Sequence, residues 1–316
     1  MRKLLVLLAL LGSSGAYAGQ DIRLTLQQGV PVTEADIAGA NSVCLEPYKS
    51  PRNQLMTFDG TNWNTITVAP STTCLSTAGL TANTNYDIVV SASGGAPVLA
   101  WSPAYGQIVS GVFVPDDSHA PARFLQDGME VLASDHTKLI IGGCRINALI
   151  QCEDNHTHRW LSNYYQPVER KMLVQDPATI WAVCPSNTSP YCNATAYRQA
   201  NGNVANQLDF FCVTSCLVDV NVKAEVISGV STGGAAFVGI GLNGALGDIS
   251  DSKQQASMLP TTIAVSYPTS AHFFGYVGPG HNTMTWLEHL YVPGPYTWLG
   301  SVPPSQVSGI SGKVWN

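Results

Sequence analysis

The chain has 316 residues, a formal net charge of −6 and only 11% charged residues, against about 25% in typical soluble domains. The acidic balance argues against a nucleic-acid partner, because binding to phosphates uses clustered Lys and Arg. The length supports one large β domain or two smaller ones, and 29 glycines and 19 prolines among 45% hydrophobic residues suit a rigid extracellular or particle-bound protein.

The first residues have the features of a secretory signal peptide. Arg2 and Lys3 precede the apolar run of residues 4–11, and an Ala-Tyr-Ala cleavage site ends at Ala18. A buried N-terminal helix is the alternative interpretation. We predict a signal peptide over residues 1–18 and a mature chain that is secreted, extracellular or virion-associated. No later stretch approaches the roughly eighteen apolar residues of a membrane span, so the sequence predicts no membrane anchor.

Short strands and turns follow in the first third of the mature chain. Residues 22–26 alternate between apolar and polar types, and the Asp-Gly pair at 59–60 is a strong hairpin signal. Residues 79–86 form a leucine-led turn that ends in a tyrosine, which resembles the tyrosine corner of β-sandwich domains. These features predict a small N-terminal β-sandwich over residues 19–111.

The remaining residues, 112–316, are predicted to form a larger antiparallel, jelly-roll-like sandwich. Residues 126–128 (Gln-Asp-Gly) give another hairpin turn. Residues 218–226 alternate strictly, which is typical of an antiparallel strand with one dry face and one wet face. We expect residues 210–226 to be a strand pair joined at a turn that contains two cysteines. No segment longer than about ten residues has a helical period, so the predicted fold class is all-β.

Eight cysteines in the mature chain indicate disulfides, because their number is even and a signal peptide precedes them. A zinc site is the alternative, but the usual C-x₂-C spacing is missing. Eight cysteines allow about 105 connectivities. Pairing of sequence neighbours gives the hypothesis Cys44–Cys74, Cys144–Cys152, Cys184–Cys192 and Cys212–Cys216.

Three polar groups are candidates for chemistry. The densest contains Glu153, Asp154, His156 and His158, which could hold a metal or act in acid–base chemistry; a solvated loop is the favoured interpretation. Residues 116–119 (Asp-Asp-Ser-His) lie in a predicted connector. Glu288 and His289 are adjacent and should point to opposite faces of a strand. No nucleophile elbow or phosphate-binding loop is present. We predict no enzymatic activity, no cofactor and no metal.

Aromatic residues are the candidates for contact with sugars, with sheet core or subunit interface as the alternative. They are Trp63, Tyr105, Trp160, Tyr164, Tyr165, Trp181, Tyr191 and Tyr197. Loops on a rigid scaffold often carry binding function, so we expect residues 144–158 and 184–197 to be displayed. The predicted ligand contacts in or beside these loops are Trp181, Tyr191, Tyr197, His156 and His158.

Several short segments occur in a shared order over nearly the whole mature chain. They are residues 28–33, 47–49, 58–63, 79–87, 125–128, 160–165, 198–203, 238–242, 286–288 and 308–312. In this order they resemble a widespread group of phage and prophage tail-associated, tail-fibre or virion structural proteins. The resemblance implies a β-rich particle component without catalytic residues. It also implies a homo-oligomer, expected to be trimeric, with other virion proteins and a cell-surface glycan as candidate partners.

The signal peptide and the cysteines depart from that group, whose members assemble in the cytoplasm, and they place this chain in an oxidising compartment. The sequence therefore predicts a non-enzymatic structural or host-attachment protein of a phage-like virion or tail. The alternative is a secreted bacterial surface, filament or carbohydrate-binding β protein, and a hydrolase is a third, less favoured hypothesis.

Overall fold

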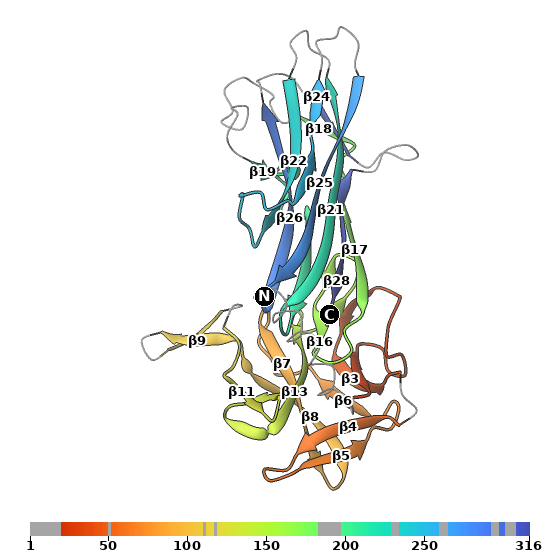
Figure 1. Ribbon diagram of the computed structural model, residues 1–316, viewed down its shortest axis with the longest axis vertical. Helices are drawn as coiled ribbons and strands as arrows, with labels where there is room; N and C mark the ends of the chain where they lie inside the picture. The colour runs from red at the N-terminus through yellow and green to blue at the C-terminus, as the bar shows by residue number, and fades with distance from the viewer. Residues whose placement is uncertain are drawn as a thin grey trace, which may run out of the picture.

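The computed structural model describes residues 20–49, 52–109, 112–116, 119–182, 197–228, 234–258, 265–291, 297–300 and 308–316. The predicted signal peptide lies outside them. Long strands form one end of an elongated molecule and shorter strands form the other (Figure 1). Apart from one 3₁₀ turn at Ala200–Gly202, the described elements are strands, and the predicted all-β class is confirmed.

The short strands build an N-terminal module with sheet orders β1-β3-β6, β4-β5 and β11-β12-β13-β7-β8, the last extended by β16 beside β13. Their bounds are β1 Ile22–Thr25, β3 Ser42–Pro47, β4 Gln54–Phe58, β5 Trp63–Thr67, β6 Thr73–Ser76, β7 Asn85–Ser93, β8 Ala96–Ala104, β11 Arg123–Gln126, β12 Met129–Leu132, β13 Asp135–Arg145 and β16 Leu161–Asn163. A separate hairpin, β9 (Gly106–Val109) with β10 (Val112–Pro115), leaves this module between β8 and β11.

The core of this module extends well past residue 111. Strand β13 pairs with β7, with Leu139 opposite Val90, and both residues belong to a hydrophobic cluster that reaches Leu161 and Tyr165. The expected boundary between residues 111 and 112 therefore does not divide the two cores. The predicted connector is instead the β9–β10 hairpin and its return, after which the chain adds further strands to the same module.

Local turn signals in the module formed as predicted. Asp127 (φ 51°) and Gly128 (φ 87°) occupy the hairpin between β11 and β12, and two central residues with positive φ are characteristic of a type I′ turn. The hydroxyl of Tyr86 accepts a 3.0 Å hydrogen bond from the backbone N–H of Thr81. This bond is the tyrosine-corner contact that the turn at residues 79–86 predicted.

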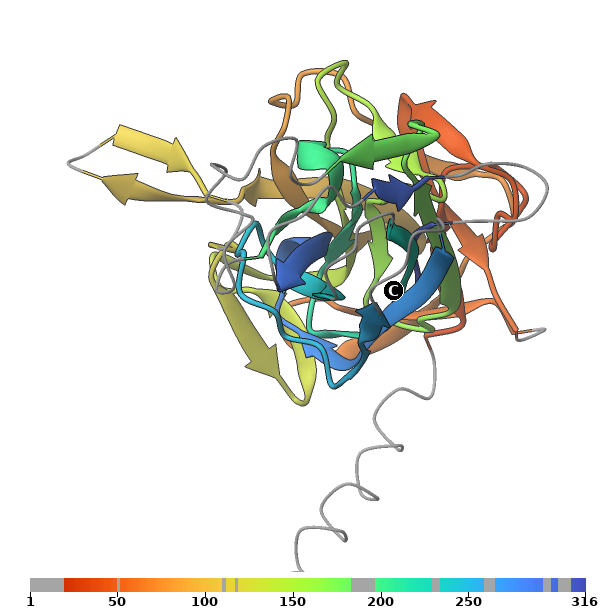
Figure 2. The ribbon, with the colours of Figure 1, turned by 90° about the horizontal axis from the view of Figure 1, so that it is seen from above.

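The long strands form a jelly-roll-like sandwich of two facing sheets (Figures 1 and 2). The eight-stranded sheet contains β2 Ile37–Ala40, β14 Cys152–Asp154, β15 His158–Arg159, β19 Arg198–Gln199, β20 Gln207–Cys212, β22 Gly234–Leu242, β24 Ala256–Met258 and β26 Gly280–Tyr291. The seven-stranded sheet contains β17 Glu169–Gln175, β18 Ile180–Ala182, β21 Cys216–Ser228, β23 Ser252–Gln254, β25 Val265–Val277, β27 Thr297–Leu299 and β28 Gly309–Trp315. Among the described strands the pairing is antiparallel except between β15 and β20.

Strand β21 carries the strict alternation at residues 218–226. Its apolar positions are all buried between the sheets: Val218, Val220, Val222, Ala224 and Val226. The cluster around them also contains the fully buried Trp286 and Trp298, one from each sheet. The predicted dry face of this strand is confirmed, and it forms the centre of the sandwich core.

Strands β20 and β21 do not form a ladder with each other, contrary to the expected strand pair at residues 210–226. β20 pairs with β26 in one sheet, and β21 pairs with β25 and β28 in the other. The turn closed by the Cys212–Cys216 disulfide therefore carries the chain from one layer of the sandwich to the other.

The two modules share a packed junction. Val89, Tyr105 and Ile140 of the N-terminal module belong to one buried cluster with Phe211 and Val213, which lie at the end of β20 and just beyond it. At the same junction β15 pairs in parallel with β20. Strand β2, which lies early in the chain, joins the eight-stranded sheet beside β14. The modules are consequently linked by a shared core and by strand β2, which precedes most of the N-terminal module in sequence but belongs to the sandwich.

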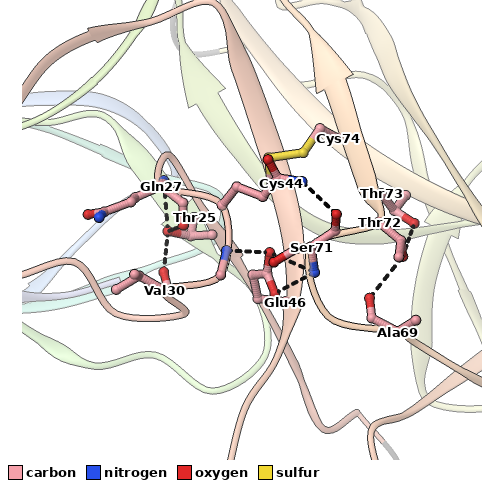
Figure 3. The surroundings of a disulfide bond; sticks show 12 residues. Thr25, Gln27, Val30, Cys44, Glu46, Ala69, Ser71, Thr72, Thr73 and Cys74 are labelled. Carbon is pink, nitrogen blue, oxygen red and sulfur yellow. Dashed lines mark hydrogen bonds between the residues drawn. A yellow bond between two sulfur atoms is a disulfide. The ribbon is translucent and has the colours of Figure 1, made fainter.

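Three of the four proposed disulfides lie in the described residues, and all three are present: Cys44–Cys74, Cys144–Cys152 and Cys212–Cys216. Cys184 and Cys192 lie outside the described residues. Cys44 and Cys74 are directly opposed on β3 and β6 (Figure 3). Beside them the buried Glu46 accepts hydrogen bonds from the backbone N–H groups of Gly29, at 2.8 Å, and Ser71. The disulfide and this carboxylate together hold two loops against β3.

Loop length should set how much each disulfide contributes to stability. Cys44 and Cys74 are 30 residues apart, and Cys212 and Cys216 are 4 apart. By loop entropy, replacing the first pair with alanines should lower the free energy of unfolding by about 3.5 kcal/mol, and replacing the second pair by about 2 kcal/mol. Non-reducing denaturant unfolding of the two double variants measures both values. A larger loss from the 212/216 pair would contradict the entropic account.

Candidate functional site

A candidate binding surface lies on the outer face of the seven-stranded sheet. Alternation along β21 turns Asp219 and Asn221 outward while their neighbours enter the core. The register then places side chains of four strands in cross-strand rows. One row is Phe274, Asp219, Lys313 and Lys171, and the next is His272, Asn221, Ser311 and Leu173.

A groove of about 390 Å³ follows these rows across β17, β28 and β21, and we call it the outer groove. Its lining residues are His156, Lys171, Met172, Leu173, Asp219, Asn221, Ser311, Gly312 and Lys313. A second hollow of about 400 Å³ shares His156 and Lys171 with it and continues toward Glu34 and Arg170. The two hollows therefore meet at the edge of the sheet formed by β17.

Charged groups in the outer groove are mostly paired within the sheet. Asp219 Oδ1 lies 2.9 Å from His272 Nε2, and Lys313 Nζ lies 3.1 Å from Glu169 Oε1. Among the described residues no carboxylate is within ion-pair distance of Lys171. The groove thus offers ammonium, amide, hydroxyl and carboxylate groups together, and Lys171 is its least engaged donor.

Exposed aromatic side chains border the polar rows. Phe274 and Tyr276 both project from the outward face of β25, and Tyr276 is 73% exposed. Phe274 is opposite Asp219 in the register. Aromatic faces beside a few placed hydrogen-bonding groups suit a ligand that has both apolar and hydroxylated surfaces. The outer face presents both kinds of group side by side.

Of the predicted ligand contacts that the structure describes, His156 alone lines the outer groove. Its Nδ1 lies 2.5 Å from Asp36 Oδ1, and its backbone N–H donates to the same oxygen at 2.9 Å. Its carbonyl accepts a 2.9 Å hydrogen bond from the backbone N–H of Leu173. These contacts fix the loop that carries His156 against β17, so the imidazole is held at the groove edge.

The other predicted contacts lie elsewhere. His158 is 2.7 Å from Glu153 and stacks on Trp160, beside a separate hollow of about 330 Å³. Tyr197 packs against His289 on the outer face of the eight-stranded sheet, away from the outer groove. Tyr191 lies outside the described residues.

The prediction that Trp181 contacts a ligand is wrong. Its side chain is buried, with 6% exposure, and its Nε1 donates to Glu288 Oε2 at 2.8 Å. Its ring meets Trp286 edge to face in the sandwich core. An indole with a buried hydrogen-bond acceptor is stable in a core, and this one serves packing.

Glu288 and His289 point to opposite faces, as expected. Glu288 is fully buried, and it accepts hydrogen bonds from Trp181 and, at 2.7 Å, from Arg198 Nε. Burial raises the pKa of this carboxyl above its ordinary range, while Arg198 opposes the shift. His289 contacts the rings of Tyr197 and Phe237 on the other face. The two side chains cannot act on one substrate.

The polar cluster at residues 153–158 separates into different contacts. Glu153 pairs with His158, and His156 pairs with Asp36, whereas the buried Asp154 bridges Arg159 and Arg170. Within the described ranges no group of three or more His, Cys, Asp or Glu side chains could hold a metal ion.

No protein-family model, curated protein or solved structure matches the chain. No helix within the described ranges has the length and apolar character needed to cross a membrane. The three disulfides are typical of a protein from an oxidising compartment.

The structure adds site residues that the sequence did not single out, notably Lys171, Asp219, Asn221, Lys313 and Phe274. The wet face of residues 218–226 was a visible signal for two of them. The other three lie on β17, β25 and β28, and only the sheet register brings them beside β21.

A second electrostatic feature lies in the N-terminal module. Asp87 is fully buried and accepts hydrogen bonds from Tyr105, at 2.6 Å, and from Arg123, at 2.9 and 3.0 Å. Burial raises the pKa of Asp87 to about 6, although Arg123 opposes the shift. The folded chain therefore retains a proton that the unfolded chain has released between about pH 4 and 6.

This pKa shift predicts that stability falls as pH rises from about 4 to 6, by on the order of 3 kcal/mol from Asp87 alone. Asp87→Asn should flatten the pH dependence of the free energy of unfolding in this window. Asp59→Asn is the matched control, because hydrogen bonds lower the pKa of Asp59 and its contribution is lost only at lower pH. An unchanged slope in Asp87→Asn, measured by urea unfolding at several pH values, would contradict the assignment.

Proposed function

We propose that the chain is a non-enzymatic structural or host-attachment component of a phage-like particle, exported through its signal peptide, and that the outer groove is its recognition surface. The observation that carries the proposal is an open groove on the outer face of the sandwich, which contains several polar side chains and lies beside the exposed rings of Phe274 and Tyr276. The resemblance of the ordered segments to tail-associated proteins supports the particle context. The shared core between the modules supports a role in holding shape.

The chemistry of the groove favours a cell-surface glycan as the ligand. Neighbouring strands are about 4.8 Å apart, so the row of Asp219, Lys313 and Lys171 presents polar groups at intervals comparable with the width of a sugar ring. Phe274 at the end of that row offers a ring face to the apolar side of a pyranose. Such a surface recognises a repeating saccharide without altering it.

Carboxylates near the groove support the non-enzymatic part of the proposal. Asp219 is paired with His272, and Glu169 with Lys313. Glycoside hydrolysis uses two carboxylates on either side of the scissile bond, whereas these two are separated by β28 and are already engaged by His272 and Lys313. Turnover in a broad glycan-hydrolysis screen that Asp219→Asn abolishes would overturn this part.

A second candidate is a secreted bacterial surface, filament or carbohydrate-binding protein outside any particle. The disulfides favour it, because phage structural proteins that assemble in the cytoplasm do not form such bonds. Both candidates use the same groove and differ in what the chain is assembled with.

Groove substitutions test recognition. Lys171→Ala, Asn221→Ala and Phe274→Ala should each weaken binding to host-surface polysaccharide about 10-fold, because each removes a hydrogen bond or stacking contact of roughly 1.4 kcal/mol. Screening on a glycan array, followed by calorimetry with the retained saccharide, measures the effect. Lys138→Ala is the matched control, since Lys138 is an exposed lysine on β13 in the other module. Three variants that bind like the parent would remove the groove from the proposal.

Particle association is tested separately. An antibody against this chain should label the tail or surface of purified particles in electron micrographs. Label confined to cells or to shed filaments, with none on particles, would favour the second candidate and overturn the first.

A further inference from the structure

The hollow that adjoins the outer groove concentrates cationic side chains. It has a volume of about 400 Å³ and lies where residues 32–34, between β1 and β2, meet the first residues of β17. Arg159 of β15 lines it together with Arg170 and Lys171 of β17. We call it the cationic hollow.

Two of these cations are buried and share a single carboxylate. The side chains of Arg159 and Arg170 are 3% and 7% exposed. Asp154 lies 3.0 Å from Nη1 of Arg159 and 2.8 Å from Nη2 of Arg170. Among the described residues it is the only carboxylate within ion-pair distance of either guanidinium. A positive charge therefore remains in a desolvated position, which is costly without a counter-ion.

The guanidinium groups in this region repel one another. Burial lowers the pKa of Arg170 below its ordinary value; attraction to Asp154 opposes that shift and repulsion from Arg159 adds to it. The half-exposed Asp36 has a smaller effect. Burial lowers the pKa of Arg23 to about 10, and repulsion from Arg170 is the next cause. Arginine stays protonated at neutral pH, so a bound anion would relieve this repulsion.

The cationic side chains differ in how fully they are engaged. Nε and Nη2 of Arg159 donate to the carbonyl of Lys171 at 3.1 and 2.8 Å, so Arg159 holds the backbone of β17 and contributes charge. Within the described ranges Arg170 makes its contacts through Nη2, with the carbonyl of Thr33 at 2.8 Å and with Asp154. Its other nitrogens and the Lys171 ammonium are left as donors for a ligand.

Two carboxylates line the cationic hollow. Glu169 lies 3.1 Å from Lys313, which balances its charge. Glu34 is exposed and has no ion-pair partner within the described part of the chain. Glu34 and the buried Asp154 stand against three lining guanidinium and ammonium groups, so the lining keeps an excess of positive charge.

We propose that the cationic hollow binds a tetrahedral oxyanion, a phosphate or sulfate group. Guanidinium groups hold the oxygens of such a group through directed N–H donors, and an ammonium adds a point charge. The volume of about 400 Å³ far exceeds the ~30 Å³ that a water molecule occupies in the liquid, so there is room for a larger molecule that carries the group. The hollow meets the outer groove at His156 and Lys171, but the site does not require the groove to bind a glycan.

Titration calorimetry on the full mature chain tests the site with inorganic phosphate, inorganic sulfate and glucose 6-phosphate. Glucose and sodium chloride are the controls. At least one of the three oxyanions should bind saturably, whereas neither control should. Glucose 6-phosphate that binds at least about 10-fold tighter than the free ions identifies a group carried on a larger molecule, and comparable affinities identify the free ion. Absence of saturable binding by all three would overturn the proposal.

Two substitutions in the lining should change the affinity in opposite directions. Arg170→Lys keeps the charge but loses the guanidinium fork, so phosphate should bind at least about 10-fold more weakly. Glu34→Gln removes a repelling carboxylate, so phosphate should bind about 3-fold more tightly. Asp59→Asn is the matched control, because it makes the same change in net charge at the turn between β4 and β5.

Circular dichroism checks that each variant is folded, and the exposed Glu34 gives a test that does not disturb the core. Phosphate affinities that neither lining substitution alters, or that Asp59→Asn alters as much as Glu34→Gln, would show nonspecific binding and overturn the proposal. Phe274→Ala should leave phosphate binding intact. Loss of saccharide binding in that variant with phosphate still bound keeps the test of the outer groove separate from the test of the cationic hollow.

Discussion

The strand at residues 216–228 constrains the sandwich more than any other element. Its alternating valines are buried against the eight-stranded sheet, and burial of one such side chain contributes about 1.5–3 kcal/mol. Because strand periodicity is two, a slip of one residue would expose all of them and bury Asp219 and Asn221. The register with β25 and β28 is therefore strongly specified, and the same register assembles the outer groove. Core packing and the layout of the surface site are thus consequences of one pattern.

Buried carboxylates in this protein connect parts of the fold. Asp209 Oδ1 lies 2.5 Å from Trp160 Nε1 and 2.6 Å from His281 Nε2. These contacts connect β20, which carries Asp209, both to the segment between β15 and β16 and to β26. Asp176 accepts hydrogen bonds from the side-chain amides of Asn201 and Asn206. A buried charge is costly unless donors surround it, and each of these carboxylates has such donors. Because their hydrogen bonds are satisfied inside the fold, we assign these carboxylates a structural role. The partly exposed Asp219, in contrast, remains accessible to a ligand.

Features encoded over a few residues could be predicted from the sequence, and features that depend on distant pairing could not. The Asp127-Gly128 turn, the Tyr86 corner and the three described disulfides each join residues whose relation is visible along the chain. In contrast, β13 pairs with β7 across about fifty residues of sequence. No local pattern reveals this pairing, so the predicted module boundary was wrong. Trp181 stands beside a Cys-containing loop and so suggested exposure, but its buried acceptor, Glu288, is 107 residues away. The outer groove is lined by three strands, β17, β21 and β28, and by the loop that carries His156, and these segments are far apart in the sequence.

The junction fixes how the two modules lie relative to each other. Tyr105 directly precedes β9, its hydroxyl donates a hydrogen bond to Asp87, and its ring meets that of Phe211 edge to face at 5.7 Å. Phe211 belongs to β20, whose neighbours continue into the sandwich. A packed aromatic contact of this kind transmits orientation, because dense cores resist shear and bending. The N-terminal module is consequently held in a fixed orientation relative to the sandwich that carries the outer groove.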